Sequence, residues 1–240
     1  MTNSVDQSEI QQFSKDSSHW WNENGPFKPL HRLNPVRLSY IKSQICDHFE
    51  RDFKALDALS GLNILDVGCG GGLVCEPLAR LGGNVSGADA DTNAIEVAKT
   101  HAKNSGLSIS YLNKAAEEID QKFDVVLALE IIEHVREPQE FVTSVAKLVK
   151  PGGLVVFSTL NRNPKSFLLG IVAAEYILRW VPKGTHSWQK FIKPSELVRY
   201  ARHSGLDASD ITGLIYNPLK DEFALSKSDL DVNYLLTAKS

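Results

Sequence analysis

Residues 62–72, LNILDVGCGGG, constrain the fold more than any other stretch of the chain. An apolar run carries Asp66 near its end, and four glycines then occupy the five positions 68–72. Glycine adopts backbone angles that other residues avoid, and it lets a ligand approach the main chain. Ligands of open α/β sheets bind beyond the carboxyl ends of the strands. The stretch therefore predicts a strand, a ligand-binding loop and a helix, in that order.

Strand-like and helical segments alternate from residue 63 to residue 158. The pattern predicts strands at 63–67, 84–89, 107–112, 123–129 and 154–158, the last after the turn 151–153, and helices at 73–81, 92–105 and 138–149. Strands that alternate with helices favour a mostly parallel sheet covered on both faces. The sequence therefore predicts the α/β class.

The alternation ends after residue 160. We expect an interruption at about 161–193, a helix at 194–203, and closing strands at 206–214 and 232–237 that pair in antiparallel fashion. Residues 1–60 read as a polar, helical cover that GPFKPLHRLNPVR breaks, and residues 61–240 read as the ligand-binding domain.

Composition limits the partners and the compartment. The net charge of -3 gives no global basic field, so we expect no nucleic-acid partner. Three cysteines, Cys46, Cys69 and Cys75, lack a paired spacing, which indicates a reducing compartment and argues against a thiolate metal site. The N-terminus lacks the apolar core of a signal peptide, and no stretch reaches the roughly 20 apolar residues that span a bilayer. We expect a cytoplasmic protein.

The glycine loop departs from both phosphate-binding patterns. Leu73 stands where the dinucleotide fingerprint G-x-G-x-x-G has its third glycine, and no G-K-[ST] follows as in a P-loop. The carboxylate of Asp66 opposes a pyrophosphate but suits an ammonium group, and Asp89 ends the second strand, where an acid binds ribose hydroxyls. These features favour S-adenosylmethionine (SAM). The alternative for Asp89 is a turn or helix cap before Thr92.

The segment EIIEH, residues 130–134, follows the fourth predicted strand. If this turn is helical, Glu130, Glu133 and His134 lie on one face. Two carboxylates and an imidazole suit Mg²⁺ or another hard divalent cation, which would lower the pKa of a bound hydroxyl. Alternatively His134 alone acts as a general base. A capped, exposed turn without chemistry is the third interpretation.

Several segments together resemble a known family. LDVGCGGG, VSGAD, FDVVLALEIIEHV, PGG and FSTLNRN are similar to the Rossmann-like class I methyltransferase fold. WW at 20–21, FKPLHRLNPVRLSYI, STLNRNPKS, AEYILRWVPKGTH, FIKPSEL and ITGLIYNP resemble the bacterial ubiquinone biosynthesis O-methyltransferase family. The resemblance covers nearly all of the chain from residue 20 onward. It implies SAM-dependent O-methylation of a polyprenylated catechol and of the later demethylubiquinol.

The resemblance also assigns residues. It implies that Arg37 holds the methionine carboxylate of the cofactor and that Leu129 lines its adenine side. Asp66, Gly68, Gly70 and Asp89 complete the expected cofactor site. The family favours Glu130, Glu133 and His134 as metal ligands, with His134 also the candidate catalytic base. Without the family, a surface salt bridge is the better interpretation of Arg37.

Two further features stay open between functional and structural interpretations. Residues 167–181 are apolar and have basic flanks, so they predict either peripheral membrane contact through 165–190 on the inner face or a buried helix over the active site. Trp20 and Trp21 are adjacent, so one packs in the core while the other covers the cofactor. A larger biosynthetic complex is a further possible partner.

Three other functions compete with the main hypothesis. The first is methylation of a carbon or nitrogen acceptor. The second is a nicotinamide dehydrogenase, which Leu73 opposes. The third is a non-catalytic module that binds SAM or lipid.

Overall fold

The structure, a computed structural model, describes residues 6, 9–10, 14–167, 188–218 and 220–240. Its centre is an eight-stranded sheet in the order β3-β2-β1-β4-β5-β8-β6-β7. The strands β1 to β5 pair in parallel, and β8 pairs in antiparallel fashion with both β5 and β6. The predicted α/β fold with an antiparallel C-terminal strand is confirmed. The strands are β1 Asn63–Val67, β2 Asn84–Asp89, β3 Ser110–Asn113, β4 Phe123–Leu129, β5 Val149–Leu160, β6 Asp207–Asn217, β7 Glu222–Ser226 and β8 Asn233–Lys239.

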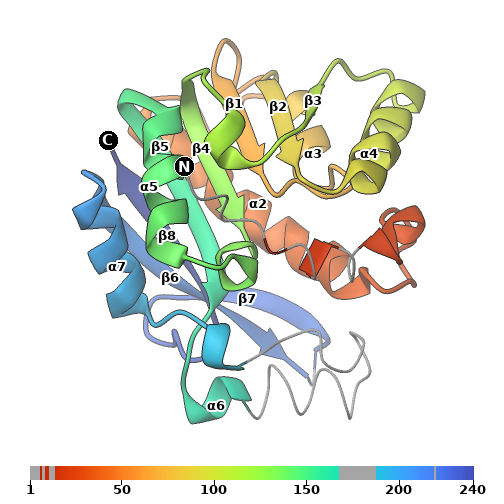
Figure 1. Ribbon diagram of the computed structural model, residues 1–240. Helices are drawn as coiled ribbons and strands as arrows, with labels where there is room; N and C mark the ends of the chain where they lie inside the picture. Colours follow the sequence, from red (N-terminus) through yellow and green to blue (C-terminus); the bar gives the residue numbers. More distant parts are fainter. Residues whose placement is uncertain (1–5, 7–8, 11–13, 168–187, 219) are drawn as a thin grey trace.

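Helices cover both faces of this sheet (Figure 1). Their bounds are α2 Lys28–His48, α3 Cys75–Arg80, α4 Thr92–Asn104, α5 Pro138–Leu148, α6 Pro164–Ser166 and α7 Pro194–His203. Short 3-10 turns are η1 Ser17–His19, η2 Ala116–Glu118, η3 Ile132–His134 and η5 Trp188–Lys190. The strand order reverses between β1 and β4, and this switch point is where open α/β sheets bind their ligands.

Alternate residues of the central strands pack into two separate hydrophobic cores, one on each face of the sheet. Leu65 and Val126 pack with α5 and α7 in one core, whereas Ile64 and Val125 pack with α2, α3 and α4 in the other. The two-residue period of a strand produces this division, because successive side chains point to opposite faces. The sheet is therefore buried on both sides, and only its ends are open to a ligand.

The structure corrects several predicted boundaries. The proposed break at GPFKPLHRLNPVR is wrong, because α2 begins at Lys28 and continues through Pro35. Proline is well tolerated in the first helical turn, as at Pro29, and the buried face of α2 outweighs the hydrogen bond that Pro35 loses. The turn predicted at 151–153 lies within β5. The strand β7 was not predicted, and it forms a hairpin with β6 after Asn217-Pro218, a dipeptide typical of turns.

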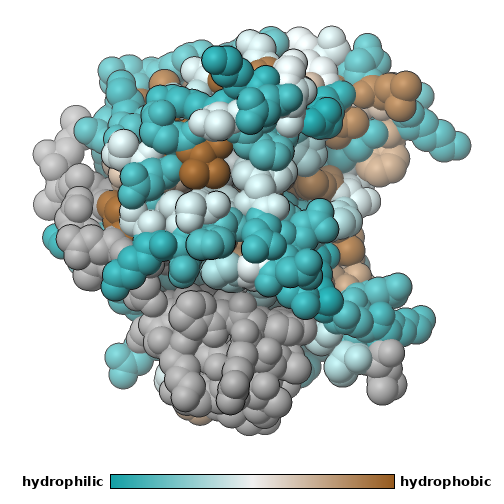
Figure 2. Space-filling view, turned by 90° about the vertical axis from the view of Figure 1, so that its right-hand side faces the viewer, coloured by the Kyte–Doolittle hydropathy of each residue, from teal (hydrophilic) through white to brown (hydrophobic). Residues whose placement is uncertain are grey.

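Exposed apolar side chains are few on the described surface. The large ones are Phe53, Leu56, Phe167 and Leu225. Figure 2 shows one face that is covered mainly by hydrophilic residues, with hydrophobic residues in small separate patches. Among the described helices, none is long and apolar enough to cross a membrane. The apolar segment 167–181 lies, apart from Phe167, outside the described residues.

Candidate active site

The glycine loop leaves β1 in a tight turn beneath β2. The backbone N–H groups of Gly68 and Cys69 both donate to the carbonyl of Ala88, at 2.7 and 3.1 Å. Gly68, Gly70 and Gly72 have φ of 74°, 51° and 88°, which is the left-handed region where glycine carries no steric cost. Backbone conformation therefore favours glycine at positions 68, 70 and 72.

Protein side chains fill the space that these glycines leave. A Cβ at Gly68 would lie 2.3 Å from Cδ1 of Ile131, and a Cβ at Gly72 would lie 2.3 Å from the hydroxyl of Tyr111. At Gly70 the obstacle is Trp20, 2.4 Å away. Real Cβ atoms do not approach other heavy atoms this closely. Close packing within the protein therefore requires glycine at these positions, even before a ligand is considered.

Asp89 joins the ends of β1 and β2. Its carboxylate accepts a hydrogen bond from the N–H of Gly70 at 2.9 Å and another from the N–H of Asp91 at 2.8 Å. Burial raises the pKa of Asp89, while these two N–H donors oppose the rise. The helix cap that the sequence left open for this position belongs to Asp91, whose side chain accepts from the N–H of Asn93 at 2.9 Å.

Arg37 and Asp66 are both buried, and their charges interact. Arg37 donates from Nη2 to Asn34, and its buried Nε has no partner in the described part of the chain. Burial raises the pKa of Asp66 to about 7, although the charge of Arg37 and a 3.5 Å hydrogen bond from Cys75 oppose the rise. The predicted surface salt bridge for Arg37 is wrong, because this side chain is 4% exposed.

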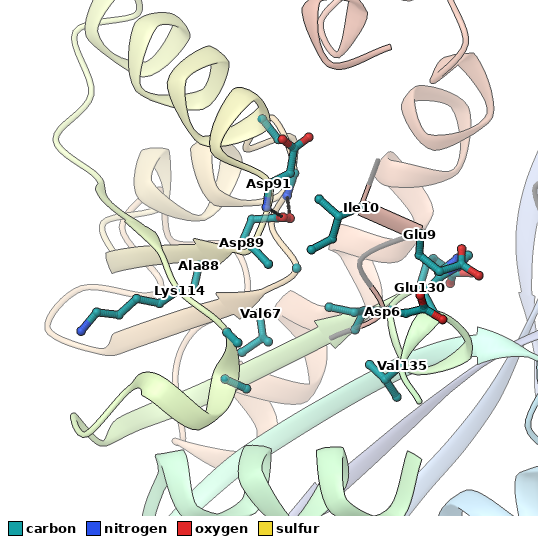
Figure 3. Close-up of a pocket in the computed structure, with 18 of the residues that line it drawn as sticks. Asp6, Glu9, Ile10, Val67, Ala88, Asp89, Asp91, Lys114, Glu130 and Val135 are labelled. Atoms are coloured by element: carbon teal, nitrogen blue, oxygen red, sulfur yellow. Dashed lines mark hydrogen bonds and ion pairs between the residues drawn. The ribbon is translucent and has the colours of Figure 1, made fainter. Parts of the chain in front are cut away.

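One pocket brings several of the predicted site residues together (Figure 3). Asp89 and Asp91 lie near the middle of the view, Glu9 and Glu130 lie to the right, and Lys114 lies to the left. The residues predicted for the site that line this pocket are Gly68, Gly70, Asp89, Glu130 and His134. Arg37, Asp66, Leu129 and Glu133 are buried and do not belong to this lining. Asp6, Glu9 and Ile10 line the pocket from the N-terminal segment.

Glu130 turns the chain sharply at the end of β4. Its φ is 53°, the left-handed region that costs a non-glycine residue roughly 1–2 kcal/mol. Its carboxylate accepts from the hydroxyl of Ser158 at 2.6 Å and from the amide of Asn233 at 3.0 and 3.1 Å. The expected helical face is wrong for Glu130, since the 3-10 turn begins only at Ile132.

Glu133 and His134 belong to the 3-10 turn but contact different partners. Glu133 accepts from the hydroxyl of Thr159 at 2.8 Å, and its second oxygen, Oε1, is buried without a partner in the described part. Burial, together with the charge of Glu130, raises the pKa of Glu133 to about 7. His134 donates from Nδ1 to Glu9 at 3.1 Å. Burial is the largest single influence and works against the charged form of His134, but the bond to Glu9 and the charges of Glu133, Glu9 and Glu130 together raise the pKa.

These three side chains do not converge on one centre. Among the described residues, no three His, Cys, Asp or Glu side chains form a group that could hold a metal ion. Glu130 is engaged with β5 and β8, whereas His134 is engaged with the N-terminal segment. The arrangement as it stands does not fit the expected divalent cation.

Several residues that hold the site side chains were not predicted from the sequence. Ser158 and Thr159 lie near the end of β5, just before Leu160, and donate to Glu130 and Glu133. Their place near the carboxyl end of a neighbouring strand was a signal that could have identified them. Glu9 and Lys190, which form a 2.7 Å ion pair beside His134, are 181 residues apart and carry no local signal. Asn233 likewise reaches Glu130 only through the sheet order.

Comparison with known proteins identifies relatives at high sequence identity. A family described as a methyltransferase domain matches residues 65–157. The ubiquinone biosynthesis O-methyltransferase of Cereibacter sphaeroides is 51% identical over 237 residues, covering 98% of this chain and 96% of the relative. The protein of the same name from Bartonella bacilliformis is 53% identical over 238 residues, covering 98% and 96%.

Solved structures share the fold at much lower identity. The magnesium protoporphyrin IX methyltransferase of Synechocystis PCC 6803, with bound SAM, superposes with a TM-score of 0.65 at 14% identity and covers 99% of each chain. A possible histamine N-methyltransferase from Thermotoga maritima gives a TM-score of 0.64 at 14% identity, covering 97% of this chain and 98% of that one. Such low identity supports the class I SAM-dependent methyltransferase fold and no particular acceptor.

Proposed function

The chain belongs to the family of ubiquinone biosynthesis O-methyltransferases, and from this premise we propose that it methylates a hydroxyl oxygen of a polyprenylated catechol and of the later demethylubiquinol. SAM is the methyl donor. The observation that carries the proposal is the near-complete, roughly 50% identical match to relatives of this name, together with a pocket at the switch point of a class I methyltransferase fold.

We assign the donor side of the pocket to the residues around the glycine loop. Arg37 does not line the pocket itself, but its buried Nε has no partner in the described residues, and the carboxylate of the cofactor would supply an anionic acceptor. Asp89 is held by two backbone N–H groups at the end of β2, the place where an acid binds ribose hydroxyls. Gly68 and Gly70 line the same pocket, and the buried Leu129 and Asp66 lie outside its lining, near the ends of β4 and β1.

The chemistry requires an oxygen nucleophile that has lost its proton. The sulfonium of SAM supplies the activated methyl group. His134 lines the pocket and is the candidate that takes the hydroxyl proton, and Glu9 holds its ring and stabilises the charge that forms. Holding the methyl group and the oxygen in line supplies most of the remaining rate enhancement.

A divalent cation remains a prediction from the sequence. Its expected ligands, Glu130, Glu133 and His134, are partnered separately, so the proton transfer above is derived without it. Among the described residues, the buried and unpartnered Oε1 of Glu133 is what favours a cation.

The domain organisation, the membrane contact and the larger complex also remain proposals. We propose that residues 1–60 act as a cover on the domain 61–240, with the insertion at about 161–193. We propose peripheral membrane contact through 165–190, which the apolar run at 167–181 and its basic flanks support. A biosynthetic complex on the inner face of the membrane would suit a substrate that resides in the bilayer.

The test is methyl transfer from labelled SAM to a short-chain 3-prenyl catechol, with and without a chelator. We expect methylated product with the catechol and none with the matched phenol that lacks the second hydroxyl. Loss of activity with chelator and recovery with Mg²⁺ would support the cation. Transfer that ignores the chelator would assign deprotonation to His134 alone. Absence of transfer to any catechol, with cofactor bound, would refute the acceptor.

A further inference from the structure

Trp20 lies directly against the glycine loop. A Cβ at Gly70 would sit 2.4 Å from Cζ2 of Trp20, and a Cβ at Gly71 would sit 2.4 Å from its Cβ and Cγ. The indole is also stacked on Phe27, with 3.8 Å between ring centroids and 7° between planes. Two of the four loop glycines are thus required by this one side chain, which itself lines the pocket.

Trp21 holds the same loop from another direction. Its Nε1 donates to the carbonyl of Gly71 at 2.9 Å. Its ring stacks on His101 of α4, with centroids 3.5 Å apart and planes 5° apart, and His101 is bonded at 2.6 Å to the buried carboxylate of Glu76 in α3. Trp21 therefore ties the loop to the two helices that flank it.

The residues before these tryptophans reach the second strand. The hydroxyls of Ser17 and Ser14 donate to the carboxylate of Asp91 at 2.7 and 3.0 Å. Asp91 in turn donates its N–H to Asp89, the residue assigned to the ribose. The segment 14–27 thus contacts both loops that the cofactor would use, after β1 and after β2.

One polar atom in this arrangement points to a ligand. Nε1 of Trp20 is buried and has no hydrogen-bond partner within the described residues. A buried N–H without an acceptor is rare, because it forfeits the hydrogen bond that water would provide. The atom belongs to a ring that lines the pocket, so a bound cofactor is placed to supply the acceptor.

We propose that residues 14–27 form a clasp on the cofactor loop, in which Trp20 and Trp21 are positioning residues for SAM. Trp20 walls the pocket and donates its indole N–H to the bound cofactor, and Trp21 fixes Gly71. This inference rests on the proposed function, since it assumes that the cofactor occupies this pocket. It adds that cofactor affinity depends on residues 14–27, which lie outside the glycine loop at 68–72.

The test compares the affinity for S-adenosylhomocysteine, measured by titration calorimetry, among three variants of the full chain. Trp21→Phe keeps the stacked ring and loses the bond to Gly71, so we expect affinity to fall about 3- to 10-fold. Trp20→Phe loses its N–H and keeps an aromatic wall, with a similar expected fall. Trp188→Phe is the matched control, because it removes a 3.0 Å indole bond to the carbonyl of Asn163, a contact with no part in the clasp. Its affinity should equal that of the wild type.

Kinetics separate a positioning role from a structural one. We expect both clasp variants to raise KM for SAM while KM for the catechol stays within about twofold of wild type. Unchanged cofactor affinity in Trp21→Phe and Trp20→Phe would overturn the clasp, as would an equal fall in Trp188→Phe. If Trp20→Phe does not fold, Trp21→Phe alone decides. Wild type that fails to bind S-adenosylhomocysteine would instead refute the proposed function.

Discussion

Two regions lie at the same edge of the sheet but are built differently: residues 66–72 with 89–91, proposed to bind the cofactor and here called the cofactor region, and residues 130–134 with Ser158, Thr159 and Asn233, proposed to receive the acceptor and here called the acceptor region. In the cofactor region, backbone N–H groups hold the carboxylate of Asp89, and packing fixes each glycine. In the acceptor region, side chains from distant segments hold Glu130, Glu133 and His134 separately.

This contrast suggests a division of labour. Backbone bonds and close packing cannot rearrange cheaply, so the cofactor region is preorganised for its ligand. The second region contains a strained backbone at Glu130 and an unpartnered buried oxygen at Glu133, so it is less fully satisfied than the first. We expect changes in the first region to weaken binding and changes in the second to slow chemistry.

The largest expected effect belongs to the acceptor region. Replacing His134 with glutamine removes the candidate base while it keeps a polar side chain of similar size. We expect kcat to fall about 10²- to 10⁴-fold, which is the usual contribution of a general base. Steady-state kinetics would measure this, and calorimetry should show unchanged affinity for S-adenosylhomocysteine. A variant with nearly normal kcat would remove His134 from the chemistry.

A smaller effect is expected for Asp89→Asn in the cofactor region. The amide keeps the shape of the side chain but loses the charge that two N–H donors and the ribose hydroxyls require. Charge-assisted hydrogen bonds contribute about 1.5–3 kcal/mol, so we expect cofactor affinity to fall roughly 10- to 100-fold. Asp207→Asn, at the exposed start of β6, is the matched control. Equal affinities in all three proteins would contradict the ribose assignment.

Asp66 makes the cofactor region sensitive to pH. Its pKa is about 7 in the folded protein and 3.8 as the ordinary value, so the folded state binds the extra proton between these pH values. The stability from Asp66 is fully present below pH 3.8 and is lost as pH rises through about 7. Asp66→Asn lacks this loss. The Tm of Asp66→Asn minus the Tm of wild type should therefore be about 5 °C larger at pH 8 than at pH 5.5. Thermal unfolding at both pH values checks this, and a constant difference would show that Asp66 does not titrate in this window.

The smallest predicted effect tests the strain in the acceptor region. Glu130→Gly and Glu130→Ala remove the same carboxylate, but only glycine accepts a φ of 53° without cost. We expect the glycine variant to be more stable by about 1 kcal/mol, the reverse of the usual order. Urea unfolding measures the difference, and an alanine variant of equal or higher stability would show that the backbone is unstrained.

The same two regions mark what the sequence could predict. The loop at 68–72 and Asp89 were predictable, because each depends on residues close in sequence and on a strand pattern of period two. Glu130 was misplaced, because helical spacing was assumed where the backbone is left-handed. The break proposed at GPFKPLHRLNPVR failed for a related reason, since tertiary packing of α2 overrides the local signal of Pro35.

Contacts between distant segments lay beyond prediction. The two tryptophans were recognised as a pair of interest, but only the structure shows that Trp20 explains Gly70 and Gly71. Glu9 and Lys190 meet beside His134 from opposite ends of the chain. Such contacts follow from topology, which a single sequence does not specify residue by residue.

The division of labour is tested most directly by the single-turnover rate of methyl transfer to a prenyl catechol, measured as a function of SAM concentration in Asp89→Asn and His134→Gln. Saturating SAM should restore Asp89→Asn to nearly the wild-type rate, because that variant is deficient in binding, and should leave His134→Gln slow. If saturating SAM restores His134→Gln, or leaves both variants equally slow, the two regions do not separate binding from chemistry and the account is wrong.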